Sequence, residues 1–462
     1  MVFKNDVSRR WLLGAAGVSG LAGLSACAAK AGNTTETPDS GGGGGSASGG
    51  GGGDNVPGRQ PASGTITVLG STGEHPKESL DDFTKLTGIK VNFQEFTFDK
   101  LVSMVAAGNA PDVARGQGGT DTAYLYSRKL AEPLDEYLKN SEVLKADDLA
   151  PINDVWKYDG SKQGQGQQYG LVKDYSSDFC LWVNTDLCPG VKAGDLLTYD
   201  QVKQFALDAT KITGGRQEIY GYEFYDTKPH VQWLNTVAGS KGVNIFNDDM
   251  SEIDLTSDPC IQAFEWVREL VEKKATWSVI NKSAVGSFDS FKAGRLAVLQ
   301  SGYWTQGMWG DAKPDMLKKM LMIPAPTFDG GERVSPVLAG TGLWIPAGAK
   351  NKAGAWKFFE HFFKSGKVAK DRASSGWGVP ALKSMMDLMP TETELNKAVL
   401  ATQQEEDKYL KVLNFTPYAR IDAVQTAITG AFDKMITGKT GTADMAKKAT
   451  DDINALLKRG KR

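Results

Sequence analysis

The sequence predicts an α/β protein, because strand and helix patterns alternate from residue 64 onward. The first observation is an apolar strand at 66–69, followed by the glycine-rich turn 70–73. The second is a helical spacing of apolar residues over 80–86. The third is a repeat of this order, with an alternating strand pattern at 91–95 and helical spacing again at 101–106. This order is typical of βαβ units in an α/β sheet.

Later segments extend the same prediction. Apolar residues at helical spacing form one stripe over 355–363 and another over 445–457. We find no internal repeat, and no second linker that would divide the body. Ligand sites in open α/β sheets lie at the carboxyl ends of strands, which here indicates the turns after Leu69, Val113 and Leu299.

The bulk composition excludes several classes of function. The chain has 462 residues, enough for two or three domains with their own cores. Its hydrophobic content of 40% and charged content of 23% are ordinary for a soluble globular protein. A formal net charge of -2 gives no reason to expect nucleic acid as a partner. His75, His230 and His361 are far apart in sequence, so we expect no metal site and no cofactor.

The first residues have the layout of an export signal. Lys4, Arg9 and Arg10 precede an apolar stretch at 11–26, which is shorter than the roughly 20 residues that span a membrane. The arginine pair resembles a twin-arginine signal, and the end of this stretch resembles a bacterial lipobox. That resemblance implies a signal peptide over 1–26 and a lipid on Cys27. The alternative is an ordinary secretory signal with an incidental cysteine.

A tether is predicted between this signal and the body. Residues 27–63 are rich in glycine and serine and have almost no large apolar side chains. Such a segment cannot bury enough surface to offset the entropy of ordering, so we expect it to be disordered. It would let the body reorient above the bilayer.

A series of motifs in the body resembles the family of extracellular solute-binding proteins that includes the maltose-binding protein. Each motif is weak alone, and the resemblance depends on their order and spacing over nearly the whole body. The motifs are Gly88-Ile89-Lys90-Val91, Gly108–Val113, Leu130–Asp135, Tyr169-Gly170-Leu171, Asn184–Leu187, Phe291–Val298 with Ser301–Trp304, and Gly340–Pro346 followed by Ala355–Phe358.

The resemblance implies a periplasmic-binding-protein-like fold of two α/β lobes, with the ligand in a cleft between them. Lobe 1 is expected over 64–175, completed by about 341–378, and lobe 2 over 176–340, completed by about 379–462. The crossing segments are expected near 173–178, 336–342 and 376–380. The resemblance also implies a binding component of an ABC importer, with permease transmembrane subunits as partners and no catalytic activity.

The predicted ligand is a carbohydrate, which needs polar side chains for its hydroxyls and aromatic rings for its C–H faces. An oligosaccharide is favoured, and a polyamine, a phosphate ester or a peptide is the alternative. A secreted glycosidase is a remote alternative, because it would need two suitably spaced carboxyl groups. The predicted ligand-binding residues are Ser71, Thr72, Glu74, Gln117, Thr120, Asp121, Asp174, Tyr175, His230, Trp233, Tyr303, Trp304, Thr341, Trp377 and Arg420.

Some of these positions carry more than one interpretation. Trp304 coincides with the tryptophan of the family's Gly-X-Trp turn and is the main expected platform for a sugar ring. Trp233 is also compatible with a core position, and Trp377 with a wedge at the hinge. Near Arg420 the chain lacks the tryptophan of the maltose binder, which argues against a maltose-like ligand.

The cysteines and the location complete the predictions. Cys180 and Cys188 are close enough in sequence for a disulfide in an oxidising compartment, and Cys260 is expected to be buried and unpaired. The protein is expected to be a monomer, anchored by lipid on the extracellular face of the cell membrane.

Overall fold

The computed structural model describes residues 56–461, apart from 225–228, 337–339 and 439. Cys27 and the predicted signal peptide lie outside the described residues. Residues 56–63, which the sequence assigns to the end of the tether, make contacts with the body. Arg59 Nε donates to Asn140 O at 3.0 Å, and Asn351 Nδ2 donates to Ser63 O at 2.8 Å. No helix within the described part of the chain is long and apolar enough to cross a membrane.

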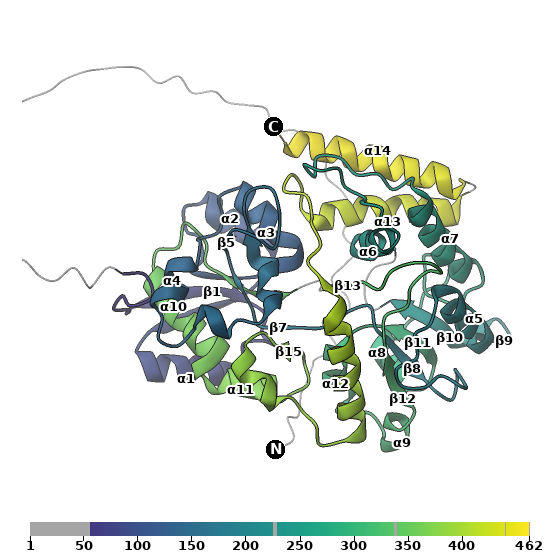
Figure 1. Ribbon diagram of the computed structural model, residues 1–462, viewed down its shortest axis with the longest axis horizontal. Helices are drawn as coiled ribbons and strands as arrows, with labels where there is room; N and C mark the ends of the chain where they lie inside the picture. The colour runs from purple at the N-terminus through teal and green to yellow at the C-terminus, as the bar shows by residue number, and fades with distance from the viewer. Residues whose placement is uncertain (1–55, 225–228, 337–339, 439, 462) are drawn as a thin grey trace, which may run out of the picture. The chain divides into compact units, whose positions relative to one another are not determined.

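The first sheet begins with the predicted βαβ units (Figure 1). Its strand order is β2-β1-β3-β14-β6, with β1 parallel to β2 and β3, and β14 antiparallel to β3 and β6. Its strands are β1 Thr65–Gly70, β2 Lys90–Glu95, β3 Val113–Gln117, β6 Leu171–Val172 and β14 Thr341–Trp344. The helices that accompany it are α1 Lys77–Thr87, α2 Phe98–Ala106, α3 Gly118–Ser127, α4 Asp135–Asn140, α10 Lys352–Glu360 and α11 Lys367–Ala373.

Local sequence signals set the ends of the first helices. α1 ends at Gly88, which adopts φ 75°, and its N–H donates to Thr84 O. α2 begins after Thr97, whose side chain accepts from Lys100 N. Because β1 is parallel to both β2 and β3, the carboxyl ends of these three strands lie at the same edge of the sheet.

The second sheet is built differently. Its order is β12-β8-β11-β10-β9, where β10 and β11 are parallel and β8 is antiparallel to both of its neighbours. The strands are β8 Leu181–Asn184, β9 Lys211–Thr213, β10 Arg216–Phe224, β11 Leu296–Gln300 and β12 Met320–Ile323. The accompanying helices are α5 Tyr199–Ala209, α6 Val231–Ser240, α7 Asp258–Glu272, α8 Ser287–Lys292, α9 Pro314–Leu317, α12 Glu394–Glu406, α13 Ile421–Thr437 and α14 Thr442–Gly460.

Short strand pairs and turns connect the two sheets. The chain passes from β6 to β8 through β7, Asp174–Tyr175, which pairs antiparallel with β15, Val379–Pro380. The other pairs are β4 Lys157–Tyr158 with β5 Gln167–Gln168, and β13 Ser335–Pro336 with β16 Leu410–Lys411. The short helical turns are η2 Ala146–Asp148, η3 Pro151–Trp156, η4 Tyr303–Trp309, η6 Lys383–Leu388, η7 Asp407–Tyr409 and the π-helical η5 His361–Ser365. This mixed α/β architecture confirms the predicted fold class.

Contacts also join α3 to the segment that leads into α13. Ser127 Oγ donates to Pro417 O at 2.8 Å, and Arg128 Nη2 donates to Gly460 O at 3.1 Å. The Arg420 guanidinium lies 3.5 Å from the centroid of the Phe98 ring on α2. The segments of α2 and α3 therefore contact both the chain that leads into α13 and the end of α14.

Candidate functional site

Glu74 and Arg115 form a bidentate ion pair near the end of β1. Glu74 follows β1 and Arg115 lies on β3, and Arg115 Nε and Nη2 each donate to one Glu74 oxygen at 3.0 Å. Lys173 Nζ lies 3.5 Å from the same carboxylate. Burial acts to raise the pKa of Glu74, but Lys173 and Arg115 outweigh it and lower this pKa to about 2. Glu74 is thus held as a half-buried, ionised carboxylate.

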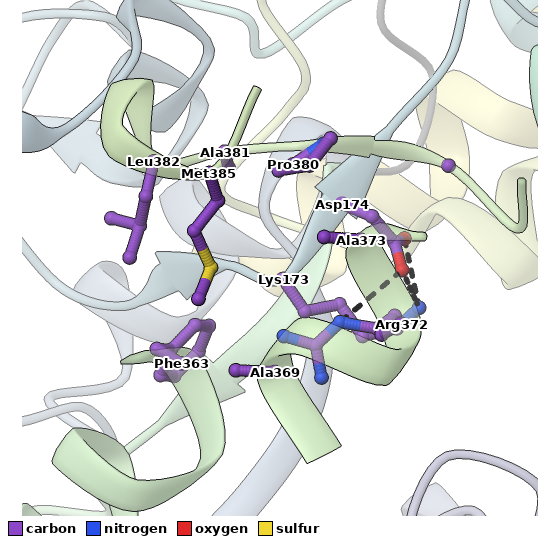
Figure 2. A pocket seen from close by; sticks show the side chains of 11 residues that line it. Lys173, Asp174, Phe363, Ala369, Arg372, Ala373, Pro380, Ala381, Leu382 and Met385 are labelled. Carbon is purple, nitrogen blue, oxygen red and sulfur yellow. Dashed lines mark hydrogen bonds and ion pairs between the residues drawn. The ribbon is translucent and has the colours of Figure 1, made fainter. Parts of the chain in front are cut away.

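The same network continues into the crossing strand β7. Lys173 Nζ lies 2.8 and 2.7 Å from the two oxygens of Asp174, and Arg372 Nε lies 3.8 Å from that carboxylate. Burial lowers the pKa of Arg372, while Asp174 and Glu74 oppose this effect. Figure 2 shows these side chains around a cavity of about 10 Å³, which is room for about one water molecule. A cavity of this size cannot hold a sugar, and the carboxyl groups of Glu74 and Asp174 are each held in ion pairs.

The predicted contacts after β3 mainly stabilise the start of α3. Asp121 accepts a hydrogen bond from Gln117 N at 2.8 Å, and burial raises the pKa of Asp121. Thr120 is buried, with its hydroxyl 3.5 Å from Gln117 O. The Gln117 side chain is half-buried, and Thr341 is its partner across the β3–β14 ladder. The turn after β1 is similar, since Thr72 N and Oγ1 donate to Glu95 at 3.0 and 2.7 Å and Ser71 O accepts from Glu74 N at 2.9 Å.

An aromatic group lies at the end of β11, on η4. Trp304 is half-buried, and its ring centroid is 5.5 Å from that of Phe288, edge to face. The centroid of Trp377 is 6.4 Å away, with the two ring planes only 17° apart. Trp377 is 42% exposed and lies on Gly307, where an added Cβ would come within 2.7 Å of the indole. Two parallel indole rings from distant parts of the chain therefore meet here.

Asp178 joins this aromatic group and was not among the predicted site residues. Its carboxyl accepts hydrogen bonds from Ser176 Oγ, at 2.8 Å, and from the side chain of Trp304. Gly302 makes this approach possible, because a Cβ there would lie 2.9 Å from Asp178 Oδ1. Burial raises the pKa of Asp178 to about 7. The available sequence signal was an acidic residue at the end of a crossing segment.

Two of the predicted contacts have side chains that pack in the core. Trp233 is fully buried, and its Nε1 donates to Tyr199 OH at 2.6 Å. Tyr303 is fully buried as well, although it is the neighbour of Trp304. Successive residues on η4 point in different directions, so only one of the two rings reaches the surface.

The remaining predicted residues occupy three separate places. His230 caps the N-terminus of α6, with Nδ1 accepting from Gln232 N at 3.2 Å. Tyr175 is buried in β7, and its hydroxyl donates to Asp407 at 3.3 Å. Arg420 pairs with Asp422 beside the Phe98 ring. None of these three contacts Trp304 among the interactions of the described residues.

The possible disulfide between Cys180 and Cys188 is not formed in this structure. Cys180 and Cys188 are free, buried thiols, and β8 runs between them. A four-residue strand extends by about 13 Å, whereas bonded cysteines keep their Cα atoms about 4.4–6.8 Å apart. Cys260 is buried and free, as predicted. Among the described residues there is no group of three or more His, Cys, Asp or Glu side chains that could hold a metal ion.

Comparison with solved structures finds the same fold in sugar complexes. An ABC substrate-binding protein from Listeria monocytogenes, in complex with cycloalternan, has a TM-score of 0.71 at 23% identity over 86% of this chain and 99% of that chain. A solute-binding protein from Thermotoga lettingae, bound with α-D-tagatose, has a TM-score of 0.67 at 21% identity over 85% and 99%. The GacH receptor of Streptomyces glaucescens, studied with acarbose, has a TM-score of 0.66 at 20% identity over 86% and 99%. No curated protein matches the chain.

These similarities define the class of protein as one with the two-lobed fold of solute-binding receptors. The sequence adds the family. Residues 70–369 match the model of the bacterial extracellular solute-binding proteins, and the chain belongs to that family. The predicted recognition is therefore confirmed.

Proposed function

We propose that the protein is the substrate-binding component of an ABC importer and that it captures a carbohydrate outside the cell. The observation that carries the ligand class is the Trp304–Asp178 pair. An indole face packs on the C–H face of a sugar, and a carboxylate at the ring edge accepts its hydroxyl protons. Asp178 lies between the crossing strand β7 and β8, and Trp304 follows β11, so both residues are next to strands of the second sheet.

The similar structures support a sugar as the ligand. The Listeria monocytogenes protein was solved with cycloalternan and the Thermotoga lettingae protein with tagatose, so this fold accommodates both large and small sugars. We favour an oligosaccharide here, because the parallel Trp304 and Trp377 rings offer more aromatic surface than a single ring needs.

The arrangement of the chain is part of the same proposal. Residues 64–175 with 341–378 would form lobe 1, and 176–340 with 379–462 would form lobe 2. The two would close on the ligand by a hinge at β7 and β15. A twin-arginine signal peptide over 1–26, a lipid on Cys27 and the linker that follows it would hold the monomeric receptor on the outer face of the membrane, near its permease.

Calorimetric titration of the purified body with a panel of mono- and oligosaccharides tests the ligand class. A sugar that binds should stabilise the fold by about 2.7 kcal/mol at a hundredfold excess over Kd. Trp304→Ala should abolish that stabilisation. Trp277→Ala is the matched control, because Trp277 is a half-buried tryptophan that packs edge to face against Tyr220 instead. Binding of amines or peptides with no response to any sugar would refute the carbohydrate proposal.

A further inference from the structure

The charge state of Asp178 separates it from the other carboxyl groups near the crossing strands. Glu74 pairs with Arg115, and Asp174 pairs with Lys173. Asp178 accepts only from neutral donors, and no lysine or arginine of the described residues forms an ion pair with it. The charged group that influences the pKa of Asp178 is another acid, Asp174, which raises it further. Asp178 is therefore a carboxyl group that lacks a cation.

The side chains around Asp178 match the chemistry of a cation site. Trp304 donates its indole N–H to the carboxyl group, so the acid stands at the edge of that ring. The Trp377 ring is nearly parallel to it, and Trp377 is 42% exposed. Aromatic faces attract a positively charged nitrogen within about 6 Å of the ring centroid. A carboxyl group at the ring edge adds a negative charge to that attraction when it is ionised.

Accessibility allows a ligand to reach this place. Asp178 and Trp304 are both half-buried, whereas their neighbours Ser177 and Tyr303 are buried. A half-buried carboxylate without a cation is costly, and a cation supplied by the ligand would reduce that cost. A neutral sugar offers only a hydroxyl to the same group.

We propose that Asp178, Trp304 and Trp377 recognise a protonated nitrogen on the ligand, so that the preferred ligand is an amino sugar. This inference rests on the proposed function, because it names the chemical class of sugar bound at the same site. The ammonium group lies against the Asp178 carboxylate, and the sugar ring that carries it packs on the indole.

The probes are two disaccharides with one skeleton, the β-1,4-linked glucosamine dimer with free amines and its fully N-acetylated form. Calorimetry on the intact body should give at least about tenfold tighter binding of the free amine form. In Asp178→Asn this preference should fall to near one, because the amide keeps the hydrogen bond to Trp304 but carries no charge. Asp407→Asn is the control, because Asp407 is a half-buried acid that accepts hydrogen bonds from Gln403 and from Tyr175 of the same crossing strand. This substitution should not change the preference.

The pH dependence supplies a second measurement. Asp178 takes up a proton as the pH falls through about 7, so affinity for the free amine form should weaken there and should not do so in Asp178→Asn. The other charged groups near this crossing strand are Asp174, Lys173 and Arg372. Their ion pairs with one another are the same in the parent protein and in Asp178→Asn, so they do not contribute to the difference.

The outcomes separate this inference from the proposed function. Equal or tighter binding of the acetylated dimer, or binding of neutral sugars only, would overturn the inference and leave the receptor a sugar binder. An amine preference that survives Asp178→Asn would overturn the assignment to Asp178. Binding of spermidine with no response to any sugar would refute the carbohydrate function and the amino-sugar ligand together.

Discussion

The ion pair between Glu74 and Arg115 gives a quantitative prediction for stability. Glu74→Gln removes a carboxylate whose pKa is about 2 in the folded protein and 4.5 as a reference. A shift of this size corresponds to about 3 kcal/mol of folding free energy at neutral pH. The Glu74 side chain is only 17% exposed, so solvent screening reduces this stabilisation little.

The sign of the pH dependence follows from the lowered pKa. The stabilisation is fully present above the reference value of 4.5 and is lost as the pH falls through about 2. The difference between the parent protein and Glu74→Gln should therefore shrink to roughly half near pH 3. Urea denaturation at neutral and acid pH measures both values.

The control for this prediction is Glu132→Gln. Glu132 pairs with Lys352 at 2.8 Å, but both side chains are more exposed, at 24% and 32%. Its loss should cost no more than about 1 kcal/mol. A Glu74→Gln protein as stable as its parent at neutral pH would refute the reasoning, as would an effect that does not depend on pH.

The other predictions concern the aromatic group, the acid beside it and the anchor. Trp304→Ala should lower ligand affinity by a few kcal/mol with little loss of stability, whereas Trp233→Ala should cost about 3–5 kcal/mol of unfolding free energy; calorimetry and chemical denaturation distinguish the two, and the opposite pattern would exchange their roles. Asp178→Asn should stabilise the ligand-free protein above about pH 7 by about 1–3 kcal/mol, because a raised carboxyl pKa means that folding becomes less favourable as the pH rises from about 4 to about 7; equal denaturation midpoints at pH 8 would contradict this. Cys27→Ala should abolish incorporation of labelled fatty acid and release the protein into the medium, and unchanged labelling would exclude the lipid anchor.

Sequence patterns were sufficient for the fold class because their signals are local. The strand at 66–69, the helix that ends at Gly88 and the strand at 91–95 each have a short-range pattern, and β1, α1 and β2 are found there. The family motifs work in the same way, since order and spacing along the chain can be read without coordinates. The family match over residues 70–369 agrees with that interpretation.

The candidate site was only partly predictable, because the direction of a side chain depends on packing. Tyr303 and Trp304 are adjacent in sequence, yet one is in the core and the other reaches the surface. Polar residues after strands were treated as ligand contacts, but Glu74 and Asp121 satisfy partners of their own. Asp178 was missed because its neighbour Trp304 is 126 positions away in the chain.

The sequence by itself determined the α/β class, the two-lobed family and the place of Trp304 at the end of a strand, since each is encoded in local patterns or in their spacing. Only the tertiary structure decided which charges are paired. It placed Arg115 against Glu74, left Cys180 and Cys188 at opposite ends of β8, and brought Trp377 parallel to Trp304. The physical reason is that an ion pair, a disulfide or a ring contact requires two groups within a few ångströms of each other, and the distance between segments far apart in sequence is set by how the whole chain packs.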